Sequence, residues 1–259
     1  MSAPRPSRFS VGVVAGLGLL FVVWTALTVV GALDTLDQAT AATGLTPGGG
    51  AAQIWPAIAI LTWPGILYLT IAILGLWAFQ RRLRSLAYAL WLAVPLGAGT
   101  VLGLKLLIRH PRPEATMDLI TAEGWSFPSS HLTAVVICAA MIIATVLVSR
   151  QSPLTRALAW ALGLLGVAVV TVCQWILQAH WVSDLVGGLL LGLLVAAGSL
   201  LLARVHVLPD NPWELALPKR VRPTNKLCVM IINPTKVRDV TTFRRHVDYE
   251  LRARGWDES

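Results

Sequence analysis

The sequence predicts an all-α membrane protein, a six-transmembrane-helix bundle followed by a short cytoplasmic α/β-like tail. Of its 259 residues, 56% are hydrophobic and only 13% are charged, and the mean hydropathy is +0.69. A soluble domain carries about 25% charged residues. Six apolar stretches reach the roughly 20 residues that a helix needs to cross a bilayer core. The composition excludes a soluble globule and a disordered chain, and three cysteines exclude a disulfide scaffold.

The six spans are expected at residues 9–32, 57–79, 85–108, 129–149, 157–179 and 182–203. The first is long enough to span and has no cleavage-site pattern, so we interpret it as a retained helix rather than a cleaved signal peptide. Loop 34–56 contains a run of Gly, Thr and Pro at residues 43–50, which indicates a flexible stretch. The loop either covers the outer mouth of the bundle or is a plain connector. The membrane domain is expected to occupy residues 1–206, and the tail residues 207–259.

The distribution of basic residues predicts the orientation of the bundle. Cytoplasmic loops are enriched in Lys and Arg, and here the arginines that follow spans two and four lie on the same side as both termini. Both termini are therefore expected in the cytoplasm of a cell-membrane protein, with loops 34–56, 109–128 and 180–181 facing outward. The net charge of +8 is spread along the chain: residues 1–203 hold ten Lys and Arg against six Asp and Glu, and the remainder holds eleven against seven. It indicates membrane topology rather than nucleic-acid binding.

Ionisable side chains gather at the predicted outward ends of the spans. Asp184 is the single acidic residue between 129 and 203, His131 and His180 lie in the same stretch, and Lys105 is the only lysine of the membrane portion. Charged groups in or near a membrane span are costly, so each is a functional candidate. The topology thus places four candidates on one face before any motif is considered.

The segment from Lys105 to Pro113 places three cations where span three ends. Arginine grips phosphate bidentately and lysine acts on it as a point charge. Lys105, Arg109 and Arg112 therefore predict a phosphate site. The alternative is that Arg109 and Arg112 only extend toward lipid headgroups.

Two further segments complete the predicted site. Pro128 followed by Ser129 and Ser130 at the start of span four leaves backbone N–H groups available for an anion, with His131 within reach. A simple serine N-cap is the alternative explanation for Ser129. His180 and Asp184 are four residues apart and share a helix face, so the carboxylate can fix the tautomer of the imidazole and leave its other nitrogen as base or nucleophile.

Phosphoryl transfer is the chemistry that this set of residues suits. Its transition state spreads negative charge over three oxygens, which fixed cations and N–H donors can stabilise, and it needs a nucleophile and an acid. The sequence shows no carboxylate cluster suited to a divalent cation, so we expect metal-independent catalysis without a cofactor. A phospho-histidine intermediate is the natural consequence.

These residues resemble the type-2 phosphatidic acid phosphatase family of membrane lipid phosphatases, whose signature is K-x6-R-P, then P-S-G-H, then S-R-x5-H-x3-D. The blocks occur here in order, as Lys105, Arg112 and Pro113, as Pro128, Ser129 and His131, and as His180 and Asp184. Ser130 stands in place of glycine, and Cys173 and Gln174 stand in place of Ser-Arg. The resemblance covers about residues 9–203.

The resemblance implies a role for each matched residue. His180 would attack phosphorus, Asp184 would orient it, and His131 would protonate the departing lipid alcohol. The phosphate would be held by Lys105, Arg112, Ser129, Ser130 and the position of Gln174. Gln174 cannot supply the usual positive charge, whose loss could cost a few kcal/mol of transition-state stabilisation, and Arg109 is the candidate to compensate.

The tail carries a second resemblance. Residues 227–234 are typical of a buried strand and 240–255 of an amphipathic helix, and Asn-Pro-Thr-Lys at 233–236 resembles the opening of a diacylglycerol-kinase-type domain. No Gly-Gly-Asp-Gly segment follows, and about 35 residues are too few to bury a core. The tail is therefore expected to be a remnant or part of a phosphatase–kinase fusion, or to associate with a lipid kinase domain. A basic membrane-surface tail around residues 219–222 is the alternative.

The sequence therefore predicts a membrane phosphatase that hydrolyses a lipid phosphate monoester or a polyprenyl pyrophosphate, such as undecaprenyl pyrophosphate, at the outer leaflet. The alternative is a catalytically weakened or inactive protein that binds lipid phosphates, which the loss of the arginine at Gln174 favours.

Overall fold

The computed structural model describes residues 8–42, 51–113, 124–205, 245 and 247–251. Contacts divide the chain into two units, Met1–Asp210 and Asn211–Ser259. In the first unit every regular element among the described residues is a helix, which confirms the all-α class. In the second, Arg245 and residues 247–251 are helical. The strand expected at 227–234 lies outside the described residues, as does most of the helix expected at 240–255.

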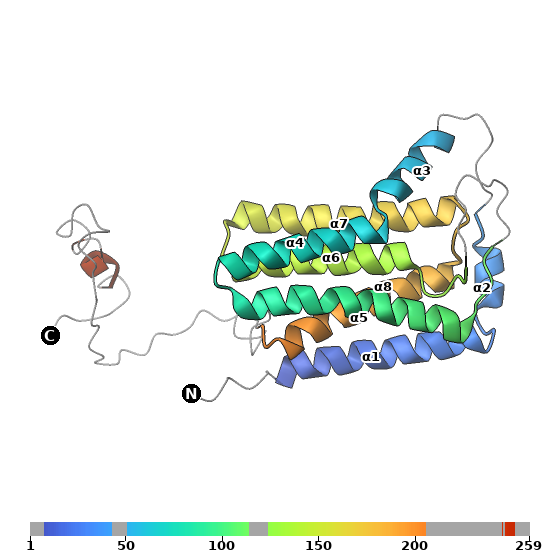
Figure 1. The fold of residues 1–259 in the computed structure, drawn as a ribbon, viewed down its shortest axis with the longest axis horizontal. Helices are drawn as coiled ribbons and strands as arrows, with labels where there is room; N and C mark the ends of the chain where they lie inside the picture. Colours follow the sequence, from blue (N-terminus) through green and yellow to red (C-terminus); the bar gives the residue numbers. More distant parts are fainter. Residues whose placement is uncertain (1–7, 43–50, 114–123, 206–244, 246, 252–259) are drawn as a thin grey trace. The chain divides into compact units, whose positions relative to one another are not determined.

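The described helices of the first unit are α1 (Arg8–Val29), α2 (Asp34–Ala39), α3 (Ala51–Leu61), α4 (Pro64–Gln80), α5 (Arg84–Ile108), α6 (Ser130–Val148), α7 (Pro153–Ile176) and α8 (Val182–Leu202). The long helices α1 and α4 to α8 run alongside one another, whereas the short α2 lies across one end and α3 slants away from the bundle (Figure 1). Six spans within the described residues are long and apolar enough to cross a membrane, with α3 and α4 joined into the single span Gln53–Gln80. The chain is thus an integral membrane protein with the expected number of spans.

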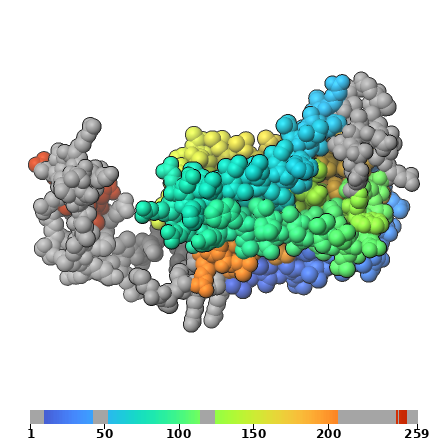
Figure 2. Space-filling model, viewed as in Figure 1, coloured from blue at the N-terminus to red at the C-terminus, as the bar shows by residue number. Residues whose placement is uncertain are grey.

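Helix α6 is the centre of the bundle. It packs against α4, α5, α7 and α8. Within its most apolar 18-residue stretch 61% of the residues are buried inside the protein, against 11% for α1. The space-filling view shows α4 and α5 side by side on one face, with α3 projecting beyond them (Figure 2). The outer helices therefore expose apolar side chains to lipid. The central position of α6 places the polar residues at its N-terminus inside the bundle.

Prolines and serines set the helix starts more sharply than hydropathy does. Pro153 occupies the first turn of α7, and the Ser152 hydroxyl accepts a hydrogen bond from the Thr155 N–H at 3.1 Å. Proline fits the first helical turn because its missing N–H would have no partner there. This cap explains why α7 begins four residues before the predicted start of the span, residue 157. Pro64 begins α4 in the same way, and Thr62 and Trp63 separate it from α3.

The segment 34–56, expected to be a loop, is partly helical in its described residues. Residues 34–39 form α2 and residues 51–56 belong to α3; the Gly-rich stretch 43–50 lies outside the described residues. Helix α2 forms because Asp37 is buried and bound to the start of α8. A segment of six residues is too short to show a helical hydrophobic period, and a contact with a distant part of the chain cannot be predicted from it.

Helices α6 and α8 approach closely where the polar residues gather. A Cβ added to Gly188 would lie 2.9 Å from the backbone oxygen of Ser129, so any larger residue there would push the helices apart. The close approach lets the Ser129 N–H donate to the backbone carbonyl of Asp184 at 3.1 Å. Glycine at this position therefore fixes the start of α6 against the start of α8.

Candidate active site

The polar residues meet at one end of the bundle, where α5 and α7 end and α6 and α8 begin. The segments just outside these helices, residues 109–113, 124–129 and 177–181, carry most of the hydrogen bonds. Three separate stretches of sequence therefore contribute to a single site.

The side chain of Asp184 contacts several residues of the site, and we call this carboxylate with its donors the hub. Its side chain is fully buried, and Oδ2 accepts hydrogen bonds from the Trp181 N–H at 2.8 Å and from the Ser126 hydroxyl. Oδ1 lies 3.0 Å from Nδ1 of His110. A buried carboxylate is stable only when hydrogen-bonded or paired, and these donors fix its orientation.

His180 lies beside this hub as predicted. Its Nδ1 is 3.6 Å from Oδ2 of Asp184 and 3.4 Å from the hydroxyl oxygen of Ser126. Only 3% of the residue is exposed, and burial lowers the pKa of His180 to about 4, although the carboxylate of Asp184 opposes this. The imidazole is therefore neutral at physiological pH, the form in which a nitrogen can act as a nucleophile.

His110 is a residue of the site that the sequence reasoning missed. Its contact with Asp184, at 3.0 Å, is shorter than that of His180, at 3.6 Å. Burial opposes protonation, but the hydrogen bond to Asp184 and the charge of this group outweigh it and raise the pKa of His110 above its usual value. His110 was passed over because it lies between two arginines that seemed to explain the segment.

Lys105 reaches from the last turn of α5 to the loop before α6. Its ammonium donates to the backbone oxygen of Ser126 at 3.1 Å and to that of Trp125. Trp125 and Ser126 are held in turn by the backbone bond from Ser126 to His110, at 2.8 Å. Lys105 therefore places its positive charge at the site and also positions Ser126.

Arg112 connects two loops of the site. Its Nε donates to the Gly124 carbonyl at 2.9 Å, Nη2 to Trp125 at 3.3 Å, and Nη1 to the Ala179 carbonyl, next to His180. The guanidinium also lines a cavity together with His180. Its charge is thus fixed beside the candidate nucleophile by backbone contacts, which a sequence motif alone does not reveal.

The start of α6 carries one buried serine and two half-buried polar residues. Ser129 is fully buried and its hydroxyl accepts from the Leu132 N–H at 3.5 Å, so the N-cap explanation holds for this residue. Ser130 and His131 are half-buried. His131 lies near the backbone of Ala59 and within range of the charges of Arg112 and Lys105.

Gln174 and Arg109 differ in their placement. Gln174 is 2% exposed near the end of α7, and its amide nitrogen has no hydrogen-bond partner among the described residues. Arg109 is exposed, has a left-handed backbone with φ of 55°, and donates from Nε to the Leu106 carbonyl of its own helix at 3.1 Å. The structure therefore does not bring Arg109 into contact with the hub.

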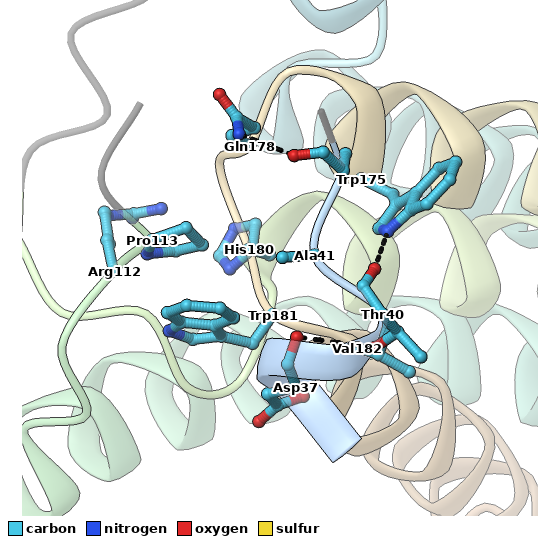
Figure 3. A pocket seen from close by; sticks show the side chains of 11 residues that line it. Asp37, Thr40, Ala41, Arg112, Pro113, Trp175, Gln178, His180, Trp181 and Val182 are labelled. Carbon is cyan, nitrogen blue, oxygen red and sulfur yellow. Dashed lines mark hydrogen bonds between the residues drawn. The ribbon is translucent and has the colours of Figure 1, made fainter. Parts of the chain in front are cut away.

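A cavity of about 420 Å³ opens beside His180 (Figure 3). Arg112 lies on one side of the imidazole, Trp181 lies below it in this view, and the segment Thr40–Ala42 lies opposite. That segment is held by hydrogen bonds from Trp175 Nε1 to the Thr40 carbonyl, at 2.8 Å, and from Gln178 to the Ala42 carbonyl, at 2.7 Å. The cavity has space for a phosphate and part of the group that carries it.

Asp37 is the second residue that the sequence reasoning missed. It lines the cavity and is 4% exposed. Its two carboxylate oxygens accept from the Ser183 N–H at 2.9 Å and from the Ser183 hydroxyl at 2.6 Å. The sequence gives only an acid in a predicted loop, where a solvated side chain is the ordinary expectation.

Within the described residues, no group of three or more His, Cys, Asp or Glu side chains is arranged to hold a metal ion. The positive charges at the site come from Lys105 and Arg112, with His110 adding a third when it is protonated. Together with neutral His180, they form a site that can bind an anion and attack it.

The chain is similar to known proteins in part of its sequence and in its fold. Residues 82–207 match the model of the PAP2 superfamily, which confirms the resemblance that the three motifs indicate. The fold is similar to a crystal structure described as the first transmembrane PAP2 type phosphatidylglycerolphosphate phosphatase from Bacillus subtilis. The TM-score is 0.61 at 21% sequence identity, over 81% of this chain and 98% of that chain. None of the curated proteins compared matches this chain.

Proposed function

We propose that this chain, which carries a PAP2 superfamily domain over residues 82–207, is an integral membrane phosphatase acting on a phosphorylated lipid. One observation carries the proposal. The neutral imidazole of His180 is held between Asp184 and Ser126 at the wall of a cavity that Arg112 also lines. A nucleophile beside a fixed cation is what phosphoryl transfer requires.

The phosphate would be bound by fixed charges and by one uncharged donor. Arg112 and Lys105 are the cations, and their proposed role is to stabilise the charge that develops on the phosphoryl oxygens. The partnerless amide nitrogen of Gln174 is a further donor. The hydroxyl of Ser130 and the backbone at Ser129 would complete the cradle at the start of α6.

In the first chemical step, Nε2 of His180 attacks phosphorus while Nδ1 faces Asp184 and Ser126. The N–P bond forms and the bond between phosphorus and the lipid oxygen breaks. His131, in its protonated form, transfers its proton to the leaving oxygen, so the lipid departs as an alcohol, or as a lipid phosphate when the substrate is a pyrophosphate. Asp184 stabilises the positive charge on His180 and keeps its ring oriented.

In the second step, water hydrolyses the phospho-histidine. His131 is now neutral and accepts a proton from the attacking water, whose oxygen forms the new bond to phosphorus. The N–P bond breaks, inorganic phosphate leaves, and both histidines return to their starting forms. Every step uses side chains of this chain and requires no metal ion.

The placement of the arginines supports a proposal for the side of the membrane on which the site lies. Arg81, Arg82, Arg150 and Arg204 lie at the bundle end opposite His180. Since cytoplasmic loops are enriched in arginine, we propose that the site faces outward and that both termini are cytoplasmic. A lipid phosphate monoester and a polyprenyl pyrophosphate both fit an outward-facing phosphate site.

A second candidate function is supported by Gln174. An amide in place of a guanidinium removes one charge-assisted contact, worth about 1.5–3 kcal/mol in the hydrogen bond alone. A loss of this size could leave a protein that binds lipid phosphates and turns them over slowly or not at all. The two candidates differ in turnover and share the binding site.

Phosphate release from the full-length protein in detergent tests the proposal. Phosphatidic acid and a polyprenyl pyrophosphate are offered separately in EDTA, and the phosphorylated enzyme is trapped at early times. We expect release from at least one lipid and an acid-labile phosphate on His180, both lost in His180→Ala. Release that survives in His180→Ala would contradict the mechanism.

A matched variant separates chemistry from folding. Ser199→Ala changes a buried polar residue of α8, 17 positions after the start of that helix at Val182 and thus about 26 Å along its axis from the site. Its activity should equal that of the unmodified protein. If no lipid is hydrolysed but His180→Ala still binds the lipid phosphate as tightly as the unmodified protein, the binding function is the correct one.

A further inference from the structure

A second hollow of about 450 Å³ adjoins the cavity beside His180. Its lining side chains come from α6, α7 and α8: Leu132, Thr171, Val172, Leu185, Val186 and Leu189. We call this hollow the α7–α8 groove. Leu132 and Leu185, at 2% and 4% exposure, form its buried floor, and Val172 lies at its exposed edge.

The groove and the cavity beside His180 adjoin each other. Thr40, Trp175 and Val182 line both of them. Val182 begins α8 only two residues after His180, and the groove then follows this helix as far as Leu189, about 10 Å along the axis at 1.5 Å per residue. A ligand bound at His180 therefore lies next to the start of the groove.

The polar atoms along this path are already hydrogen-bonded. The Thr171 hydroxyl donates to the Val167 carbonyl at 2.8 Å, and the Thr40 hydroxyl donates to the Leu36 carbonyl at 2.7 Å. The indole N–H of Trp175 donates to the Thr40 carbonyl, which places a polar edge toward the cavity and the apolar ring along the groove. The groove thus offers dispersion contacts and no group that needs a polar partner.

We propose that the α7–α8 groove is the binding site for a hydrocarbon chain of the phosphorylated lipid whose phosphate lies at His180. This inference rests on the proposed function and extends it to the apolar part of the substrate. The chain passes the contact between Trp175 and Thr40 and lies along α8 from Val182 to Leu189. Moving a lipid chain from the bilayer into the groove changes its free energy little, because both surroundings are apolar. The role of the groove is therefore to hold the phosphate in line with His180.

The test compares two substrates on the full-length protein in detergent. One is a long-chain phosphatidic acid and the other is a short, water-soluble phosphate monoester without a chain. Val186→Trp and Leu189→Trp fill the groove, and Leu165→Trp adds the same ring on α7 at a side chain that is 58% exposed. Elution as a single species in size-exclusion chromatography checks the fold of each variant.

Filling the groove should affect only the substrate that uses it. We expect kcat/KM for the long-chain lipid to fall about tenfold or more in both groove variants, the usual penalty when an apolar pocket loses its space. The short ester should stay within about twofold, as should both substrates in Leu165→Trp. Equal losses for both substrates, or no loss for the long-chain lipid, would overturn the inference.

Photolabelling gives a readout that does not depend on turnover. A phosphatidic acid with a photoreactive group in its acyl chain is irradiated with the protein, and the labelled residues are identified by mass spectrometry. Label concentrated on residues 171–189 and lost in Val186→Trp supports the groove, even if the unmodified protein hydrolyses neither substrate and the proposed function fails. Label spread evenly over the lipid-facing helices would overturn it.

Discussion

Replacing Asp37 with alanine should destabilise the protein and slow catalysis, although Asp37 belongs to none of the three motifs. Both oxygens of this buried carboxylate accept hydrogen bonds from Ser183, at 2.9 Å from the N–H and 2.6 Å from the hydroxyl. Ser183 is fully buried in the first turn of α8, where backbone N–H groups have no partner within the helix. Alanine would leave that N–H unsatisfied.

The magnitude follows from these two bonds. A buried donor without an acceptor costs about 1–3 kcal/mol, and loss of a carboxylate near a helix N-terminus costs about 0.3–1 kcal/mol more. The hydroxyl can rotate, so its share is smaller, and the total is about 2–4 kcal/mol. For a chain of this length that corresponds to a fall of roughly 5–15 °C in Tm.

We also expect slower catalysis, because Ser183 is adjacent to Asp184 in the chain and a shift of Ser183 would displace Asp184. A displacement of about 1 Å at a catalytic group can cost about 100-fold in rate, so we expect kcat to fall about 10- to 100-fold. Tm is measured by tryptophan fluorescence in detergent, and kcat by phosphate release at saturating lipid.

Asp34 provides the matched control, since it lies on the same short helix and is exposed. Asp34→Ala should change stability by less than about 0.5 kcal/mol and leave kcat unaltered. Asp37→Asn retains one acceptor and should fall between the two. The reasoning is refuted if Asp37→Ala and Asp34→Ala have the same Tm and the same kcat.

Three further predictions concern the hub and the phosphate site. Burial lowers the pKa of His180 to about 4 in the folded protein, so the unfolded chain takes up this proton at a higher pH than the folded one, and the contribution of His180 to stability should decline as pH falls from about 6.5 toward 4. Tm measured against pH should show this decline. Its persistence in His180→Ala would refute the assignment. His110→Ala removes the 3.0 Å donor of Asp184 and should lower kcat, whereas His110→Asn, which can still donate, should recover part of it; equal activity of the two variants would contradict this. Gln174→Arg should raise kcat/KM about tenfold or more by adding a charge-assisted contact, and a rate no higher than that of Gln174→Met would contradict it.

The fold was predictable because hydropathy alone decides how many helices cross a bilayer. Span ends were predicted less well, since they depend on caps such as Ser152 and Pro153, which hydropathy does not weigh. The short helix α2 within loop 34–56 was not predicted, because it depends on Asp37 meeting Ser183, 146 residues away. A contact at that separation leaves no periodic trace in the sequence.

The sequence by itself determined the membrane class and the spacing that places Lys105, His131, His180 and Asp184 at one end of the bundle, since helix length and up-down topology leave little choice. Only the tertiary structure decided how the carboxylate of Asp184 is used. Of the two histidines, it is His110 that lies nearer to this carboxylate, at 3.0 Å against 3.6 Å for His180. Such a difference depends on how loop and helix ends pack, and packing is a property of the whole fold.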